Sequence, residues 1–297
     1  MLKKWRNKEK GAIHSVELQS HKTQAIYWTL FGVLIIVAMI CLIPIIWLAL
    51  TSFKSVKEIY AAEVTLFPES ISLAKVARVW NKMNFIKYYL NSLLLCAGDI
   101  VFDIVINGLA GYVLSRLKPK GSKLLGMILL WTMMMPSGVS LVPLFQTFLD
   151  LPFIHISLVD SYLPFWLIAG TNIFNLLMFK SFFDSISKEY CEAAMIDGCS
   201  NLKIFTRIIL PLSLPIIMVV AILDFTGAWG NFLFPYLLIQ NEELYPVAVK
   251  LYELNSSGIL ADEYMMALMF GMIPPLLIFL VFQKQMMRGV SFSGVKG

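Results

Sequence analysis

Long apolar stretches alternate with short polar segments along the whole chain. A helix that crosses a bilayer needs about 20 mostly apolar residues. The first stretch is too long for the core of a signal peptide, and no small-residue cleavage site follows it. Because the apolar residues are continuous and do not alternate, a transmembrane β-barrel is disfavoured. The pattern predicts six transmembrane helices, at 25–50, 90–114, 124–145, 161–180, 212–238 and 265–283.

Composition supports an all-α integral membrane protein. Hydrophobic residues make up 58% of the 297 residues, charged residues only 14%, and the mean hydropathy is +0.75. Soluble domains have about 45–50% apolar and 25% charged residues, so a soluble enzyme is excluded. The four cysteines form no disulfide framework. The three histidines do not cluster, so we expect no metal site, and no catalytic motif such as His-Glu-x-x-His is present.

Positive charge predicts the orientation. The net charge is +5, which serves here to orient the chain in the bilayer and not to bind nucleic acid. One set of polar segments carries 17 Lys and Arg residues and the other carries 7, so both termini are predicted to be cytoplasmic. The cytoplasmic set is the basic N-terminus 1–24, the loop 115–123, the segment 180–211 and the segment 283–297, which contains the tail 285–297. The main extracytoplasmic loop is 51–89.

The cytoplasmic segment 181–211 is too long to be a simple connector between two helices. Ser187 is a plausible N-cap for a first helix, and Gly198 suits its C-terminal turn. Ser200 can cap a second helix, which Pro211 would end. The expected product is a helix–turn–helix under the membrane.

The expected outer surface of this segment suits a contact with another protein. It combines the small residues Ala193 and Ala194, which allow close approach, with the acidic residues Glu192 and Asp197, which seek basic partners.

The same residues resemble a known motif. Glu192-Ala193-Ala194, then Asp197-Gly198, then Leu210-Pro211 resemble the EAA loop of permeases in binding-protein-dependent ABC importers. More of the chain is similar to the carbohydrate branch, the MalG-like subunits. The matching stretches are Asn91-Ser92-Leu93, residues 109–116, Met135-Pro136, Val142-Pro143-Leu144, Phe232-Leu233-Phe234-Pro235 and residues 294–297. One departure is Trp229-Gly230-Asn231-Phe232, which lacks the acid of the family's usual Trp-Asn-Glu-Phe.

The resemblance implies a type I (MetI-like) ABC importer permease core over residues 90–284, in a multi-pass protein of the bacterial cell membrane. It implies three protein partners: a second permease chain, an ATPase dimer and an extracytoplasmic sugar-binding protein. No Gly-x-x-x-x-Gly-Lys-Ser/Thr phosphate loop occurs here, so ATP and magnesium are expected in the partner ATPase and no cofactor in this chain. The residues implied to couple to the ATPase are Glu192, Ala193, Ala194, Asp197, Gly198, Leu210 and Pro211.

Polar residues in the predicted spans are the candidates for a translocation path. Asp99, Asp103 and Asn107 recur every four residues, so they share one face of the second helix with Gly111. Ionisable groups at that depth face the bundle or a cavity. This face either hydrogen-bonds the hydroxyl groups of a sugar or makes contacts between helices.

The fifth span adds Asp224, Trp229 and Asn231. Trp229 either stacks on a sugar ring or packs in the core. In the fourth span, Thr171, Asn172 and Asn175 are weaker candidates, for which contacts between helices are the default interpretation. The acidic loop 239–264 either touches the binding protein, as the resemblance suggests, or is simply solvated.

The sequence therefore predicts the permease subunit of an ATP-driven importer for a sugar or oligosaccharide, which is not itself an enzyme. An ABC permease for a non-sugar solute is one alternative. A stand-alone secondary carrier is another, although the chain has no internal repeat and no paired intramembrane charges to support it.

Overall fold

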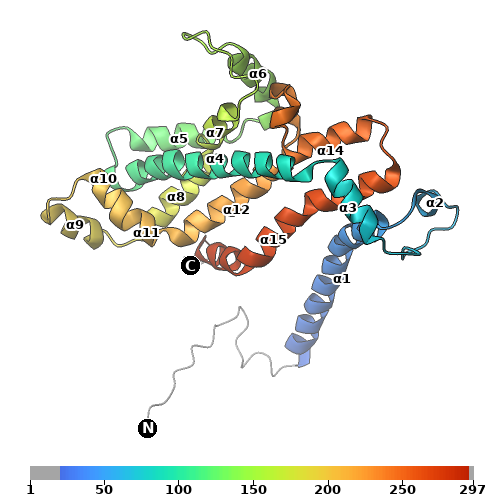
Figure 1. Cartoon of the computed structure of the whole chain (residues 1–297). Helices are drawn as coiled ribbons and strands as arrows, with labels where there is room; N and C mark the ends of the chain where they lie inside the picture. Colours follow the sequence, from blue (N-terminus) through green and yellow to red (C-terminus); the bar gives the residue numbers. More distant parts are fainter. Residues whose placement is uncertain (1–20, 294–297) are drawn as a thin grey trace. The chain divides into compact units, whose positions relative to one another are not determined.

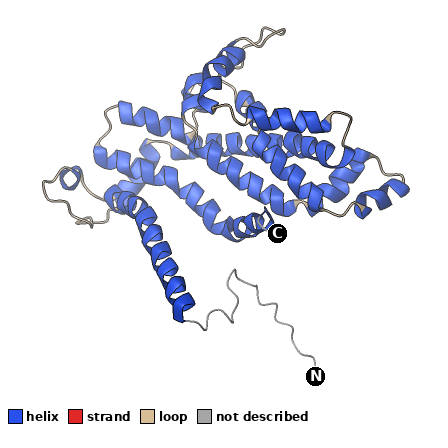
Figure 2. Cartoon of the chain, turned by 180° about the vertical axis from the view of Figure 1, so that it is seen from behind, coloured by secondary structure: helices blue, strands red, loops and turns tan. Residues whose placement is uncertain are grey.

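The computed structural model describes residues 21–293, and within this range every regular element is a helix (Figure 1, Figure 2). The all-α prediction is thus confirmed for the described residues, whereas residues 1–20 of the basic N-terminus lie outside them. The first elements are α1 (His21–Ser52), α2 (Val56–Ile59), α3 (Leu73–Lys82), α4 (Phe85–Tyr112), η2 (Val113–Leu117), α5 (Ser122–Thr132), η3 (Ser137–Ser140), α6 (Leu141–Leu149), α7 (Leu163–Ala169) and α8 (Ile173–Ser185). The others are α9 (Glu189–Ile196), α10 (Asn201–Ile204), η4 (Phe205–Ile209), α11 (Leu210–Leu212), α12 (Leu214–Gly230), α13 (Leu233–Leu238), η5 (Glu242–Leu244), α14 (Val247–Ser256) and α15 (Ala261–Ser293).

The chain forms two compact units, 1–71 and 72–297, and each is described by itself. In the first unit, the apolar side chains of α1 are exposed along its length, with none of its most apolar 18-residue window buried. After α1 the chain folds back, because the Lys54 ammonium donates to the Thr65 carbonyl and lies 5.1 Å from the centre of the Trp47 ring. An apolar helix left this bare requires lipid or another protein around it.

The second unit is built around α4, which contacts α7, α8, α12 and α14. One apolar cluster, which includes Trp229 and Phe234, packs on the first half of α4. A second cluster, which includes Phe179 and Phe183, packs near its end. Gly111 allows α8 to approach α4 closely, since a Cβ atom there would lie 2.9 Å from Phe179 Cβ and 3.0 Å from the Lys180 backbone nitrogen. The core therefore lies where these helices cross α4.

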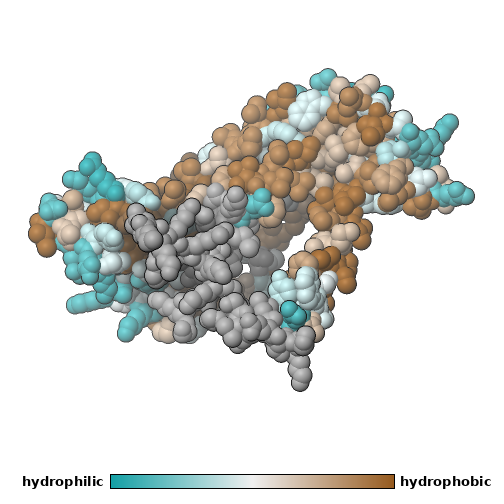
Figure 3. Space-filling model, turned by 90° about the horizontal axis from the view of Figure 1, so that it is seen from below, coloured by the Kyte–Doolittle hydropathy of each residue, from teal (hydrophilic) through white to brown (hydrophobic). Residues whose placement is uncertain are grey.

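Three helices are long and apolar enough to cross a membrane, and two bent pairs raise the number of candidate spans in the described residues to five. Many of their exposed side chains are large and apolar, and the face of the molecule drawn in Figure 3 has broad hydrophobic areas, shown in brown. The long helices are Gln24–Ser52, Phe85–Leu117 and Ala261–Gln283, and the bent pairs are Leu163–Ala169 with Ile173–Ser185, at 44°, and Asn201–Leu212 with Leu214–Gly230, at 79°.

The third predicted span, 124–145, is not one helix. α5 ends at Thr132 and α6 begins at Leu141, and between them lie the non-helical residues 133–136 and the short 3₁₀ helix η3. Pro136 explains the break, because proline has no N–H to donate and drives the residue before it out of the helical conformation. Pro143 lies in the first turn of α6, where proline is tolerated. The last helix also differs from expectation, since α15 continues to Ser293 through the predicted tail.

Candidate functional site

The segment 181–211, called the EAA segment below, folds as two short helical stretches joined by a tight turn (Figure 1). Gly198 follows α9 with a φ of +75°, which only glycine adopts freely. Ser200 caps α10, since its hydroxyl oxygen accepts a hydrogen bond from the Lys203 N–H at 3.4 Å. The predicted turn and second cap are therefore confirmed. The second stretch runs through η4 into α11 and ends at Leu212, one residue beyond Pro211.

Two local predictions in this segment are wrong. The N-cap residue of α9 is Lys188, although the Ser187 hydroxyl accepts a hydrogen bond from the Glu189 N–H at 3.3 Å. Ala194 does not belong to the outer surface, because it packs into the cluster around Phe183 and is only 6% exposed.

The exposed surface of α9 combines acids with large apolar side chains. Glu192, Ala193 and Asp197 are exposed, and Ile196 beside them is 87% exposed. Further exposed apolar residues are Tyr190, Met195 and Leu202. At the far end, Leu210 is half-buried and Pro211 is exposed. A mixed acidic and apolar surface of this kind is typical of a contact with another protein.

The end of α4 is bonded to the start of the EAA segment. In η2, the Arg116 guanidinium donates to the Phe183 carbonyl and, at 2.5 Å, to the Ile186 carbonyl. Beside it, the Ser115 hydroxyl donates to Asp184 Oδ1 at 2.7 Å. The last carbonyls of a helix have no partner within the helix. Arg116 therefore closes the end of α8 and fixes where the EAA segment begins.

A cluster of buried polar groups joins α4, α8 and α12. Asn175 Nδ2 donates to Asp103 Oδ2 at 2.5 Å and to Asp224 Oδ1 at 2.9 Å. Asp99 lies one turn before Asp103 and is 9% exposed, whereas Asp103 is fully buried. These four residues are called the Asn175 cluster. The polar face of α4 thus points into the bundle, as the sequence predicted.

The Asn175 cluster has carboxylates but no cation. Among the described residues, no ion pair involves any of its three acids. One oxygen of each acid, Asp99 Oδ1, Asp103 Oδ1 and Asp224 Oδ2, is buried without a hydrogen-bond partner. A buried polar atom without a partner destabilises the protein and requires an explanation.

The cluster opens on a cleft of ≈ 440 Å³. Its polar lining is Asp99, Asn172, Asn175, Asp224 and Asn231, and its apolar lining includes Phe165, Phe174 and Phe234. Pockets that bind small molecules have volumes of roughly 300–1,000 Å³ and combine apolar walls with a few polar groups. The geometry of this cleft fits that description.

The other predicted path residues do not line the cleft. Asn107 Nδ2 donates to the Ala169 carbonyl at 3.0 Å, and Asp103 lies behind Asn175. Trp229 is 5% exposed, donates from its indole N–H to the Gly271 carbonyl at 2.9 Å and stacks on Phe225. Trp229 is thus a core residue in this conformation.

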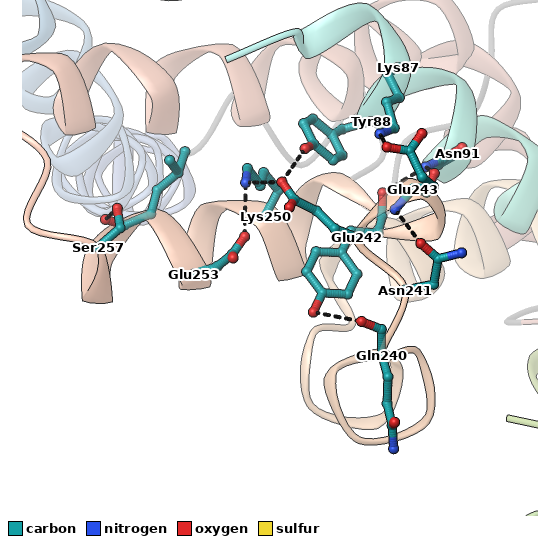
Figure 4. Close-up of polar contacts among 12 residues, drawn as sticks. Lys87, Tyr88, Asn91, Gln240, Asn241, Glu242, Glu243, Lys250, Glu253 and Ser257 are labelled. Atoms are coloured by element: carbon teal, nitrogen blue, oxygen red, sulfur yellow. Dashed lines mark hydrogen bonds and ion pairs between the residues drawn. The ribbon is translucent and has the colours of Figure 1, made fainter. Parts of the chain in front are cut away.

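A second polar cluster links α4 to α14 (Figure 4). The Lys250 ammonium donates to Glu242 at 2.6 Å and to Glu253 at 2.9 Å, and the Tyr88 hydroxyl donates to the same Glu242 at 2.9 Å. Lys87 pairs with Glu243 at 2.5 Å. These six residues are called the Lys250 cluster.

Hydrogen bonds inside the Lys250 cluster shift two pKa values. Those donated by Lys250 and then Tyr88 hold the pKa of Glu242 below its ordinary value. Burial works to lower the pKa of Lys250, but its hydrogen bonds to Glu242 and Glu253 outweigh burial and raise it.

Sequence reasoning underrated Asn175 and missed the roles of Arg116 and Lys250. One local pattern points to Asn175: Asn172 caps α8 by accepting a hydrogen bond from the Asn175 N–H at 3.3 Å, so Asn175 lies in the first turn of α8, just after the break in a bent span. Nothing in the sequence pairs Arg116 with α8 or Lys250 with Tyr88.

The chain matches a family of transport proteins. The family of binding-protein-dependent transport system inner membrane components matches residues 107–291, which include the EAA segment and most of the cleft.

Individual relatives cover most of the chain. The trehalose/maltose transport system permease protein MalG of Thermococcus litoralis is 30% identical over 89% of this chain and 94% of its own length. The polygalacturonan/rhamnogalacturonan transport system permease protein YtcP of Bacillus subtilis is 28% identical over 90% of this chain and 97% of its own. Among solved structures, a chain of a bacterial ABC transporter involved in alginate import has a TM-score of 0.76 at 24% identity, covering 89% of this chain and 98% of that one. This likeness confirms the type I permease fold.

Proposed function

The chain belongs to the family of binding-protein-dependent transport system inner membrane components, and we propose that it is the permease subunit of an ATP-driven importer for a sugar or oligosaccharide. Relatives named for saccharide transport cover about nine-tenths of the chain, which supports the substrate class. The family is one of transport components and not of enzymes. As such a component, the chain is a multi-pass protein of the bacterial inner membrane.

The exposed surface of α9 carries the proposal. Three motif residues on this surface, Glu192, Ala193 and Asp197, are exposed to solvent, as is the neighbouring Ile196. No part of the described chain covers them. An ATPase subunit with a basic, partly apolar cleft would bury this surface. Because Arg116 is hydrogen-bonded to the Phe183 and Ile186 carbonyls, a displacement of the EAA segment would also displace the end of α4. Helix α4 carries two acids of the Asn175 cluster, Asp99 and Asp103.

The partners follow from the same surfaces. A second permease chain completes the cleft into a translocation path, an ATPase dimer holds ATP and magnesium, and an extracytoplasmic binding protein delivers the sugar near the Lys250 cluster. ATP binding and hydrolysis in the partner drive the exchange between inward-open and outward-open states.

Purification from native membranes in mild detergent tests the assembly. We expect a second permease and an ATPase to copurify, with ATPase activity stimulated by a sugar-binding protein. A pure chain that transports solute in liposomes without an ATPase would overturn the proposal.

Gly198→Val tests the coupling role. A Cβ atom at Gly198 would meet no atom within 4 Å, so the change strains only the backbone of the turn, by about 1–2 kcal/mol. We expect loss of uptake with the complex still assembled in the membrane. Gly121→Val is the matched control, since Gly121 has a φ of +91° and equally open surroundings outside the EAA segment. Equal uptake by the two variants would contradict the coupling role.

Glu192→Lys tests the charge of the same surface. We expect ATPase activity that no longer responds to the binding protein. Glu189→Lys is the control, because Glu189 is an exposed acid of the same helix outside the motif. If both variants behave alike, Glu192 has no specific contact with the ATPase.

A further inference from the structure

A groove of ≈ 710 Å³ lies between the end of the span that starts with α4, the helix α5, and the helix α8. All residues of α5 are described and none of them is buried, so this helix does not close the groove. A Cβ atom at Gly126, which lines the groove from the middle of α5, would meet no atom within 4 Å. The groove therefore has room for an occupant that the described chain does not supply.

The groove lies at the end of the second unit that holds the EAA segment (Figure 1). Arg116 in η2 is hydrogen-bonded to the Phe183 and Ile186 carbonyls, so the end of one candidate span, Phe85–Leu117, adjoins the end of another at Ser185. The groove thus reaches from the ends of two candidate spans toward their interior, which corresponds to the head-group region of a bilayer and the hydrocarbon beneath it.

Charged and apolar side chains are separated along the groove. On each of the three elements, the apolar residues lie about one to two helical turns from a charged residue, in the direction of the membrane interior. The charged lining is Lys118, Lys123, Lys180 and Asp184, and the apolar lining is Leu114, Met127, Leu130 and Leu177. An occupant must therefore be charged at one end and apolar at the other.

The charged end of the groove is basic. Lys180 pairs with Asp184 at 2.8 Å, which leaves two of the three lysines to consider. Among the described residues, no ion pair includes Lys118 or Lys123. The hydroxyl group of a serine, Ser122 or Ser181, lines the groove on either side and can donate to a phosphate oxygen. The charge that this end accepts is therefore negative.

We propose that the groove binds one anionic phospholipid of the phosphatidylglycerol type, with its phosphate at Lys118 and Lys123 and an acyl chain on the apolar lining. Basic pockets between membrane helices bind anionic head groups in this way, and each lysine near the head group strengthens binding about fivefold. A free phosphate would leave the apolar half of the groove unfilled. The proposed function places the site in the cytoplasmic leaflet, because the adjoining EAA segment meets the ATPase.

Native mass spectrometry of the assembled, delipidated importer tests the lipid and its charge. The probes are phosphatidylglycerol and phosphatidylcholine with identical acyl chains, and the first should bind about tenfold or more tightly at one site. In Lys118→Gln/Lys123→Gln this preference should fall toward one, and Lys123→Gln alone should weaken phosphatidylglycerol binding about fivefold. Lys120→Gln is the matched control, since Lys120 is an exposed lysine of the same loop that does not line the groove. It should leave the preference unchanged.

Gly126→Leu tests the groove without changing its charge. Leucine forms helices more readily than glycine, so α5 should persist while the new side chain occupies the space of the acyl chain. We expect loss of the tight site. Gly32→Leu is the control, because Gly32 lies in the apolar helix α1 and a Cβ atom there would also meet no atom within 4 Å. It should retain the site.

Equal binding of the two lipids, or a preference that the double lysine variant leaves unchanged, would overturn the inference. Displacement of phosphatidylglycerol by an excess of inorganic phosphate would mean that the acyl chain has no seat, and would overturn it as well. Binding by the isolated chain but not by the importer would mean that a partner chain covers the groove, with the same consequence. The proposed function would survive each of these results if the ATPase still copurifies and responds to a binding protein, so the two failures are distinguishable.

Discussion

The Lys250 cluster and the Asn175 cluster each contain three carboxylates, but the partners of these carboxylates differ in charge. In the Lys250 cluster, every carboxylate has a lysine partner, at distances from 2.5 to 2.9 Å. In the Asn175 cluster, a single neutral amide donates to two of the acids, and one oxygen of each acid has no partner.

Exposure makes this difference significant. The side chains of Glu242, Glu243 and Glu253 are 54%, 75% and 42% exposed, so water would solvate them even without lysine. Asp99 and Asp103 are at most 9% exposed, and burial makes an unsatisfied carboxylate costly. The acids that most need partners are those that lack them. The carboxylates of the Lys250 cluster are therefore neutralised by lysines of the same chain, whereas those of the Asn175 cluster have no cation among the described residues and are held by a neutral amide.

Replacing Asn175 tests this comparison most strongly. Asn175→Leu keeps a similar volume but removes the donor shared by Asp103 and Asp224. A buried acceptor left without its donor costs about 1–3 kcal/mol, so two of them should lower stability by on the order of 3 kcal/mol. Thermal unfolding of the purified protein in detergent would measure this as a clear drop in midpoint.

An exchange of side chains supplies the control. In Asp103→Asn/Asn175→Asp, the amide moves to α4 and can donate back to the carboxylate on α8. We expect this variant to recover much of the stability lost in Asn175→Leu. If Asn175→Leu unfolds at the wild-type temperature, the hydrogen bonds of the cluster do not hold the three helices together.

The same two clusters show why sequence predicted some features and not others. The turn at Gly198 and the cap at Ser200 depend on residues three apart, so local pattern is sufficient to predict them. The bond from Asn175 to Asp103 joins residues 72 apart, and that from Asn175 to Asp224 joins residues 49 apart. Periodicity placed Asp103 on the inner face of its helix, but no local pattern identifies which side chain meets it there.

The helices, too, were predicted where a property summed over the sequence determines them, and were missed where a single residue or a distant contact does. Apolar length predicted α1, α4 and α15, because hydrophobicity is summed over many residues and tolerates local detail. It did not predict the break between α5 and α6, since length alone takes no account of the backbone effect of Pro136. Likewise, Ala194 lies on the inner side of α9 because α9 packs on Phe183, a contact that the EAA motif does not reveal.

Removing lysines from the Lys250 cluster should have smaller effects. Lys250→Met takes the partner from two glutamates, whereas Lys87→Met takes it from one. Partly exposed ion pairs contribute about 0.2–1 kcal/mol each, so we expect a loss near 1 kcal/mol for Lys250→Met and less for Lys87→Met. Hydrogen exchange of α14 amides would measure both. A loss for either lysine as large as that for Asn175→Leu would remove the contrast between the clusters.

The pH dependence of the Lys250 cluster gives the smallest effect and the finest test. The pKa of Glu242 lies below its ordinary 4.5, so its stabilising contribution is complete above that value and is lost as the pH falls through the lower folded-state pKa. The pKa of Lys250 is raised above 10.5, so its contribution is complete below 10.5 and is lost as the pH rises through the raised value. Between about pH 5 and 10 both contributions are therefore complete.

The difference in unfolding midpoint between wild type and Lys250→Met should consequently be constant from about pH 5 to 10 and shrink as the pH falls through the lowered folded-state pKa of Glu242, where Glu242 takes up a proton and its pairing with Lys250 is lost. Exposure limits the change to less than about 1 kcal/mol. A difference that stays constant while Glu242 titrates, as followed by NMR of its side chain, would mean that Lys250 stabilises α14 through its contact with the Tyr88 ring, 5.4 Å away, and not through its carboxylates. The Lys250 cluster would then be held by packing. The ion pairs that distinguish it from the Asn175 cluster would make no contribution to the free energy of unfolding.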